Sequence, residues 1–290
     1  MTTRFNVLDD TRRHPELSEL LSSILHTVAP IVRETTGLAL PAEVLYRLTT
    51  PTEWRDATRL NRHRILARDI ADQTLTPEEI SAVRGLLKIT SFVPVLVWPL
   101  VVAQTMEAAD GQVETVIAPR ALHHSGFLAN AKCLTAMTAH ELVHHAQFEA
   151  RRGLVWETYA PDRRGMDRRG LGASTVMEGH ATWTDQQTTA RLFEAPVNHR
   201  ELAKRSWRYR LHAGFPGVRR LGPRPDSYEQ GARLITHAVN AQSVDVVNQV
   251  WRDTSLLPTA KEIAAPDTWA QRLAAPSEDR GLVSKPIEQT

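Results

Sequence analysis

The feature that most constrains the fold is an apolar segment at residues 129–151 whose centre is polar. The residues before position 140 are mostly small or apolar, and so are the two that follow Glu141. The segment is therefore expected to form a buried helix. Its centre nevertheless contains His140, Glu141 and His144. A buried glutamate beside two histidines needs a partner, and a cation suits all three side chains.

The spacing of these three residues is that of the HExxH motif. Residues four apart lie on one face of a helix, so the imidazoles of His140 and His144 can reach one ion. Glu141 projects about 100° round the axis from His140, beside the metal rather than on it. From there it can act as general base toward a metal-bound water. The alternative is a solvated helix face with two histidines, because so short a motif also occurs by chance.

A third ligand is predicted in a second helical segment, at about residues 173–193. Glu178 lies there among apolar and small neighbours. Two histidines and one glutamate form an established catalytic zinc set, with one position left open for water. His180 is the rival third ligand, and otherwise a substrate contact or transition-state donor. A tetrahedral oxyanion needs a donor besides zinc, for which His180, Tyr228, His212 and His237 are candidates by residue type.

The remaining pattern predicts an α+β protein that is mostly helical, with a small β-sheet beside the HExxH helix. Thr76-Pro77 followed by two glutamates predicts a helix start that runs to about Ile89. Val-rich residues 94–104 and alternating residues 113–117 are interpreted as two paired strands. Further helices are expected at 17–33, 52–70, 200–212, 228–241 and 244–251, and a strand at 44–48. We expect one domain over 1–290, with a helical portion at 1–90 and a metal-binding catalytic portion at 91–290.

Composition excludes several other kinds of protein. Cys133 is the only cysteine, so neither an intramolecular disulfide nor a cysteine-based zinc site can form. The formal net charge of +2 gives no argument for nucleic acid or an anionic membrane as a partner. The polar, acidic N-terminus does not resemble a signal peptide, and the longest apolar run is interrupted by Pro94 and Pro99. A cytoplasmic protein without a membrane partner is therefore expected, and its oligomeric state stays open.

The order of motifs from Val113 to Leu273 resembles the zincin-like metallopeptidase family of actinobacteria, which is sometimes labelled as associated with coenzyme F420 biosynthesis. The residues that show this resemblance are Val116–Pro119, His140–Phe148, Met177–Ala181, Tyr228–Gly231, Val250-Trp251, Leu257–Thr259, Glu262-Ile263 and Pro266–Trp269. The resemblance implies a zincin-type fold with a small sheet beside the active-site helix.

The resemblance also implies zinc ligands and a general base. They are His140, His144 and Glu178 as ligands, with Glu141 as base. Tyr228 becomes the first choice among the later oxyanion donors, because it lies in a shared stretch. The thermolysin-like pattern has an aspartate four residues after the ligand glutamate, but that position is Thr182 here, and Asp185 is the nearest acid downstream.

The sequence thus predicts a zinc-dependent hydrolase that cleaves a peptide or a small amide-type substrate. One alternative is a non-proteolytic metal-dependent enzyme that modifies a small metabolite. Another is a metal-binding module without activity. Two histidines and a carboxylate can also hold Fe(II) for oxygen chemistry, but the intact Glu141 favours hydrolysis.

Overall fold

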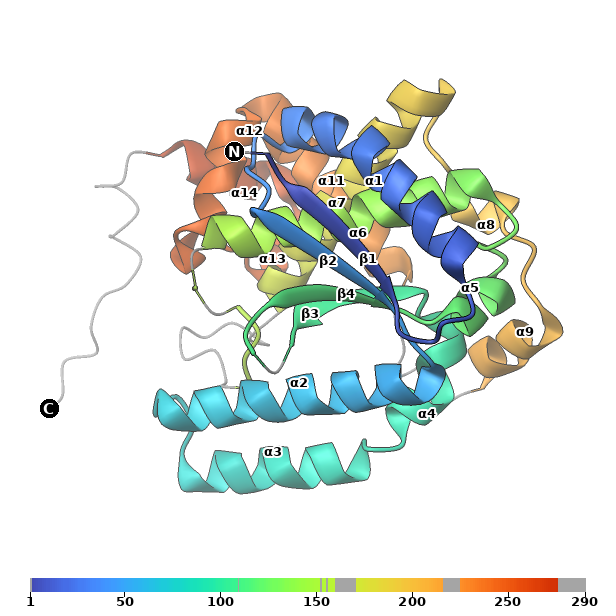
Figure 1. Cartoon of the computed structure of the whole chain (residues 1–290). Coiled ribbons are helices and arrows are strands. Elements are labelled where there is room, and N and C mark those ends of the chain that lie inside the picture. Colours follow the sequence, from blue (N-terminus) through green and yellow to red (C-terminus); the bar gives the residue numbers. More distant parts are fainter. Residues whose placement is uncertain are drawn as a thin grey trace, which may run out of the picture.

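The computed structural model describes residues 2–108, 110–151, 153–154, 156–159, 171–215 and 225–275 (Figure 1). Its helices are α1 (Pro15–Thr36), α2 (Pro51–Ala71), α3 (Pro77–Ile89), α4 (Val93–Val97), η1 (Trp98–Leu100), α5 (Pro119–Ser125), α6 (Ala131–Arg151), α7 (Leu171–Phe193), α8 (His199–Leu202), α9 (Trp207–Gly214), α11 (Pro225–Ala241), α12 (Val244–Val247), η2 (Asn248–Trp251), η3 (Thr254–Leu256), α13 (Ala260–Ala264) and α14 (Pro266–Ala274). The prediction of a mostly helical protein with a small sheet is confirmed.

The sheet has the strand order β1-β2-β4-β3. Strands β1 (Arg4–Asp9), β2 (Glu43–Leu48) and β4 (Val113–Ile117) run parallel, and β3 (Ala103–Glu107) is the antiparallel edge strand. Thr105 of β3 lies directly opposite Thr115 of β4. Because side chains alternate between the faces of a sheet, this register puts both threonines on the same face.

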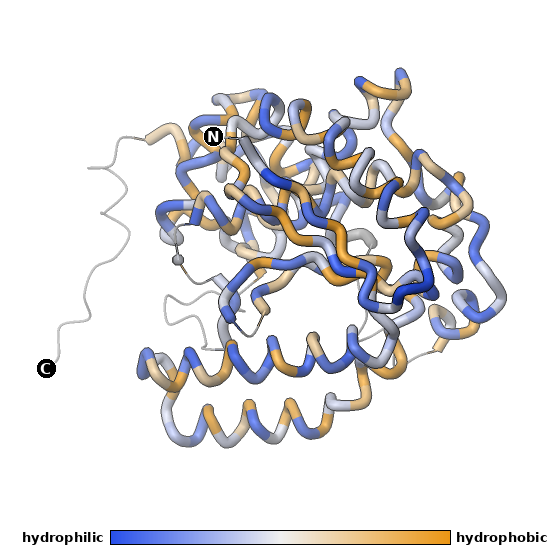
Figure 2. The backbone as a smooth tube through the Cα atoms, in the orientation of Figure 1, coloured by the Kyte–Doolittle hydropathy of each residue, from blue (hydrophilic) through white to orange (hydrophobic). Residues whose placement is uncertain are grey.

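Helix α6 lies against that face of the sheet and is buried on nearly all sides. One hydrophobic core joins α1, β2 and α6, and a second joins α7, α11 and the C-terminal helices. In Figure 2 apolar residues recur along the strands and the central helices, and along the outer helices α2 and α3 they alternate with polar ones. The apolar composition of α6 is therefore explained by its position between the sheet and α7.

The helix starts follow the local sequence. Thr50 caps α2 and Thr76 caps α3, and in each case a glutamate three residues later completes a capping box. These two helices form a hairpin on the side of the edge strand, apart from the C-terminal helices (Figure 1). Side chains of α2 bond to β3, from Thr58 to Gln104 and from Arg68 to Glu107. The hairpin therefore covers the side of the sheet where β3 has no neighbouring strand.

The prediction differs from the structure in three places. The helix expected at 200–212 is two short helices, α8 and α9. The prediction of a strand at 94–104 is wrong, because this segment forms α4 and η1, and β3 begins only at Ala103. Pro94 and Pro99 lack the N–H that a ladder requires, and both suit the first turn of a helix. Strand β1 was not predicted, and it shows that the 1–90 portion contributes two strands as well as helices.

Within the described residues, no single helix is long and apolar enough to cross a membrane. The helix pair Pro77–Ile89 and Val93–Leu100, which is bent at its junction, is long and apolar enough only when its two helices are taken together.

Candidate metal centre

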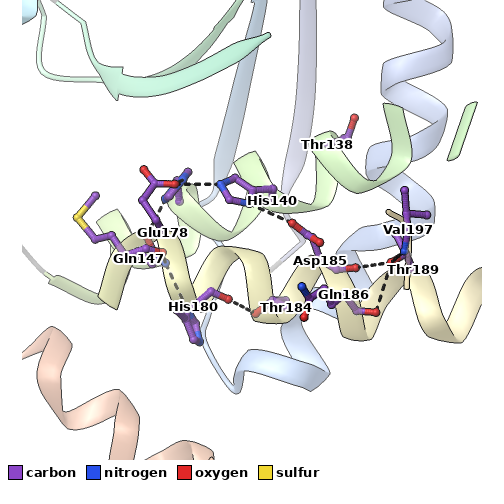
Figure 3. A network of polar contacts seen from close by, with 12 residues as sticks. Thr138, His140, Gln147, Glu178, His180, Thr184, Asp185, Gln186, Thr189 and Val197 are labelled. Carbon is purple, nitrogen blue, oxygen red and sulfur yellow. Dashed lines mark hydrogen bonds and ion pairs between the residues drawn. The ribbon is translucent and has the colours of Figure 1, made fainter. Parts of the chain in front are cut away.

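Three potential ligands from two helices converge at one point. His140 and His144 belong to α6, and Glu178 belongs to α7. Glu178 points toward His140 (Figure 3). The Nε2 atom of His140 lies 3.3 Å from Oε2 of Glu178, and Nε2 of His144 lies 3.8 Å from the same oxygen. All three ligand atoms lie within 4.8 Å of one another. The structure therefore brings together the three residues that the sequence proposed as metal ligands.

These separations fit a tetrahedral zinc ion. With metal–ligand bonds of about 2.0–2.1 Å, two ligands of such an ion lie about 3.4 Å apart. The two distances to Glu178 lie close to that value. Two imidazoles and a carboxylate also form a donor set that zinc prefers, with one position left for water. The residues present thus fit the metal that the sequence implies.

Asp185 orients the first of the two histidines. Its Oδ2 atom lies 3.1 Å from Nδ1 of His140 and accepts a hydrogen bond from the N–H there. This bond fixes the tautomer in which Nε2 keeps its lone pair for a metal. Asp185 is seven residues after Glu178, so both lie on the same face of α7. It performs the role that the thermolysin-like pattern gives to the position of Thr182.

Gln147 does the same for the second histidine. Nδ1 of His144 lies 2.8 Å from the amide oxygen of Gln147, which leaves Nε2 of His144 free for the ion. The amide nitrogen of Gln147 donates to the carbonyl of Met177 and lies 3.3 Å from Nδ1 of His180. Neither Gln147 nor Asp185 was predicted from the sequence, although the three-residue spacing from His144 and the seven-residue spacing from Glu178 are both visible in it.

His180 is not brought to the ligand cluster. It follows Glu178 by two residues, so it points away from the ligand cluster (Figure 3). Its ring contacts Trp183 and Trp251. Its side chain is fully buried, and burial together with the charge of His144 lowers its pKa to about 3. His180 is therefore a neutral residue behind the site that supports Gln147, and Glu178 is the residue placed as third ligand.

The carboxylates of the cluster stabilise positive charge at this point, which either a proton on His140 or a metal ion can supply. Burial opposes protonation of His140, but its bonds to Asp185 and Glu178 raise its pKa well above the usual value. Burial also acts on Glu178, yet the bond to His140 and the charges of both histidines lower the pKa of that carboxyl. A carboxylate stays ionised between two imidazoles, which is the state that a cation requires.

A close crossing of two helices brings Tyr228 to the same place. A Cβ atom added to Gly179 of α7 would lie 2.3 Å from the carbonyl carbon of Gly231 in α11. Because neither residue has a side chain, the two backbones touch, and Tyr228 comes to lie one turn before the crossing. The Tyr228 ring centroid is 6.2 Å from that of His140. The charge of Glu178, then burial and the charge of Glu141, raise the Tyr228 pKa, so its phenol keeps its proton.

Glu141 and the ligands line one large cavity. Its volume is about 1230 Å³, and its walls come from α2, α4, β3, α6, α7, α9 and α11. Glu141 and Tyr228 both face this space, whereas the other donor candidates do not. His212 bonds to the carbonyl of Leu96, and His237 pairs with Asp267 at the surface. Tyr228 is therefore the predicted donor that the structure places at the site.

The part of the chain that contains this site matches a known protein family. Residues 136–270 match the model of a family described as zincin-like metallopeptidase, and the match includes all three ligand positions and Glu141. This part of the chain is a zincin-like domain with an HExxH helix.

A solved structure shares the overall fold. A proposed hydrolase with a novel fold from Chloroflexus aurantiacus has a TM-score of 0.54 and 15% sequence identity to this chain. The alignment covers 91% of this chain and 92% of that one. Among curated proteins, none matches this sequence.

Proposed function

We propose that this protein is a zinc-dependent hydrolase of metallopeptidase type that cleaves a peptide or amide bond. The observation that carries the proposal is the convergence of His140, His144 and Glu178, with each histidine held in the metal-binding tautomer by its own partner. A cluster that only filled space would not need both imidazoles fixed in this way.

The chemistry follows from the residues around the three ligands. A bound zinc ion would supply Lewis acidity, which lowers the pKa of a water and polarises the scissile carbonyl. Glu141 accepts the proton of the attacking water and delivers it to the leaving nitrogen. Tyr228 keeps its phenol proton and can donate a hydrogen bond to the oxyanion that develops. The cavity walls surround the substrate on several sides.

The test combines elemental analysis with a peptide-library digest. We expect about one zinc per chain in the purified protein, little zinc in His140→Ala and Glu178→Ala, and full zinc in Glu141→Gln, which should cleave no peptide. His237→Ala is the matched control, because this histidine lies at the surface in an ion pair. Full turnover by Glu141→Gln would refute the role of the base, and absence of metal from the wild-type protein would refute the site. Zinc without cleavage of any peptide would favour a non-proteolytic enzyme acting on a small metabolite, or a binding module.

A further inference from the structure

A chain of hydrogen bonds leads from Glu141 into the sheet. The hydroxyl of Thr105 lies 2.6 Å from Oε2 of Glu141 and 2.7 Å from the hydroxyl of Thr115. The Thr115 hydroxyl in turn lies 2.9 Å from Nε2 of His145. The chain thus joins four side chains from β3, β4 and α6. The contacts that hold the three metal ligands do not involve this chain of hydrogen bonds.

The direction of each bond in this chain is fixed by the residue at its end. An ionised carboxylate only accepts, so Thr105 donates its single hydroxyl proton to Glu141. Thr105 must then accept from Thr115, and Thr115 must accept from Nε2–H of His145. His145 therefore has its proton on Nε2 and a bare lone pair on Nδ1.

The surroundings of His145 agree with this tautomer. Nδ1 of His145 is buried and has no hydrogen-bond partner among the described residues. An unpaired acceptor is less unfavourable there than an unpaired N–H would be. The ring stacks on Tyr46 with an interplanar angle of 18° and is 1% exposed, which holds its plane. A neutral ring with its only proton on Nε2 therefore leaves no buried N–H of His145 without a partner.

The chain of hydrogen bonds gives the two carboxylate oxygens of Glu141 different surroundings. Oε2 is held by Thr105, whereas no hydrogen bond to Oε1 is seen in the part of the chain that the structure describes. Glu141 itself lines the metal cavity. Oε1 is therefore the oxygen that is free to meet a water there.

We propose that Thr105, Thr115 and His145 are positioning residues that fix the carboxylate of Glu141, so that Oε1 alone serves as the base. The role of Glu141 as base rests on the proposed function, but the chain itself can be tested without turnover. General-base catalysis depends on placement of the base, and an error of 1 Å can lower a rate by roughly a hundredfold.

The first measurement is ¹⁵N NMR of the histidine side chains in the zinc-loaded full chain. His145→Phe assigns the signal, because the remaining histidines are unchanged. We expect His145 to be a single neutral tautomer with the proton on Nε2, and we expect Thr115→Val to lose that preference. A wild-type His145 with its proton on Nδ1 would overturn the proposal. The same readout in metal-free protein gives an answer even if no zinc binds, so failure of the proposed function is distinguished from failure of this inference.

The second measurement uses a peptide that the wild-type protein cleaves. Thr105→Val, which removes the hydroxyl, should lower kcat by roughly ten- to a hundredfold with KM and zinc content unchanged. Thr105→Ser, which restores the hydroxyl, should recover most of that loss. Thr188→Val is the control, because Thr188 is also fully buried but its hydroxyl has no hydrogen-bond partner among the residues that the structure describes. Wild-type kcat in Thr105→Val, or an equal loss in Thr188→Val, would refute a specific role for the chain.

Discussion

The crossing of α7 and α11 makes Gly179→Ala the most informative single change for the site. The added methyl group would lie 2.3 to 2.6 Å from three backbone atoms of Gly231. Carbon atoms in favourable contact lie about 3.5–4.0 Å apart, so the two helices must separate by about 1.2 Å or more. Backbone atoms cannot rotate away, unlike the end of a flexible side chain. The substitution therefore moves Glu178 and Tyr228 apart.

The expected loss of stability follows from two opposing terms. Overpacking of a close contact costs about 1–3 kcal/mol, and this contact lies at the upper end. Alanine in place of glycine inside a helix returns about 1 kcal/mol. The net destabilisation is about 2 kcal/mol, which lowers Tm by about 3 °C in a chain of this size. Zinc affinity should fall as well, because metal bonds tolerate only about 0.2 Å of displacement.

Gly85→Ala separates the two terms. Gly85 lies inside α3, and no atom of the described part of the chain is within 4 Å of its added Cβ, so this variant gains helix propensity without a clash. It should be more stable than the wild type by about 0.5–1 kcal/mol. Thermal unfolding followed by circular dichroism, with zinc titration of each variant, measures both effects. Equal Tm and equal zinc affinity in Gly179→Ala and Gly85→Ala would refute the close crossing.

Three further predictions concern the metal and the pH. Asp185→Asn should weaken zinc binding by roughly 10- to 100-fold, measured by competition with a chromophoric chelator, because His140 loses the carboxylate that orients it; unchanged affinity would count against that role. Removal of zinc with a chelator should lower Tm. The loss corresponds to about 4 kcal/mol of stability if the free zinc concentration was 1,000 times Kd, and the Tm of His140→Ala should not respond to the chelator. The folded-state pKa of His180 is about 3, against a usual value of 6.5. The stability that this residue contributes by staying neutral is therefore fully present above pH 6.5 and is lost as the pH falls toward 3. The loss is about 1.4 kcal/mol per pH unit, and denaturant unfolding at pH 7 and 5 should show a smaller difference in His180→Phe.

The HExxH helix and the start of α3 could be predicted because each depends on a local sequence pattern. The HExxH spacing places His140 and His144 on one face whatever surrounds the helix, and the capping box at Thr76 fixes a helix start by itself. The Val-rich segment at 94–104 is mostly helical despite its strand-like composition, because strand propensity depends on neighbours that the sequence does not show. Val97 instead packs as part of a helix in a small core with Trp54 and Met106.

The residues that support the ligands depend on tertiary contacts. The seven-residue spacing shows that Asp185 shares a face with Glu178, but only the packing of α7 on α6 aims that face at His140. Thr105 could not be predicted, because its meeting with Glu141 depends on the pairing of β3 with β4. The metal ligands could therefore be predicted from the sequence, whereas the groups that orient the ligands and the base could not.

The register of β3 against β4 has a consequence for how this protein can tolerate changes in chain length. Insertion or deletion of a single residue in β3 would turn Thr105 to the opposite face of the sheet. Glu141 would then lose its bond to Thr105, although every residue of the HExxH motif would be intact. A search for active relatives should therefore ask for the length of this hairpin as well as for the motif. Homologues that keep the motif but change the register of this hairpin are expected to keep the three metal ligands and to hold the glutamate of the motif less firmly.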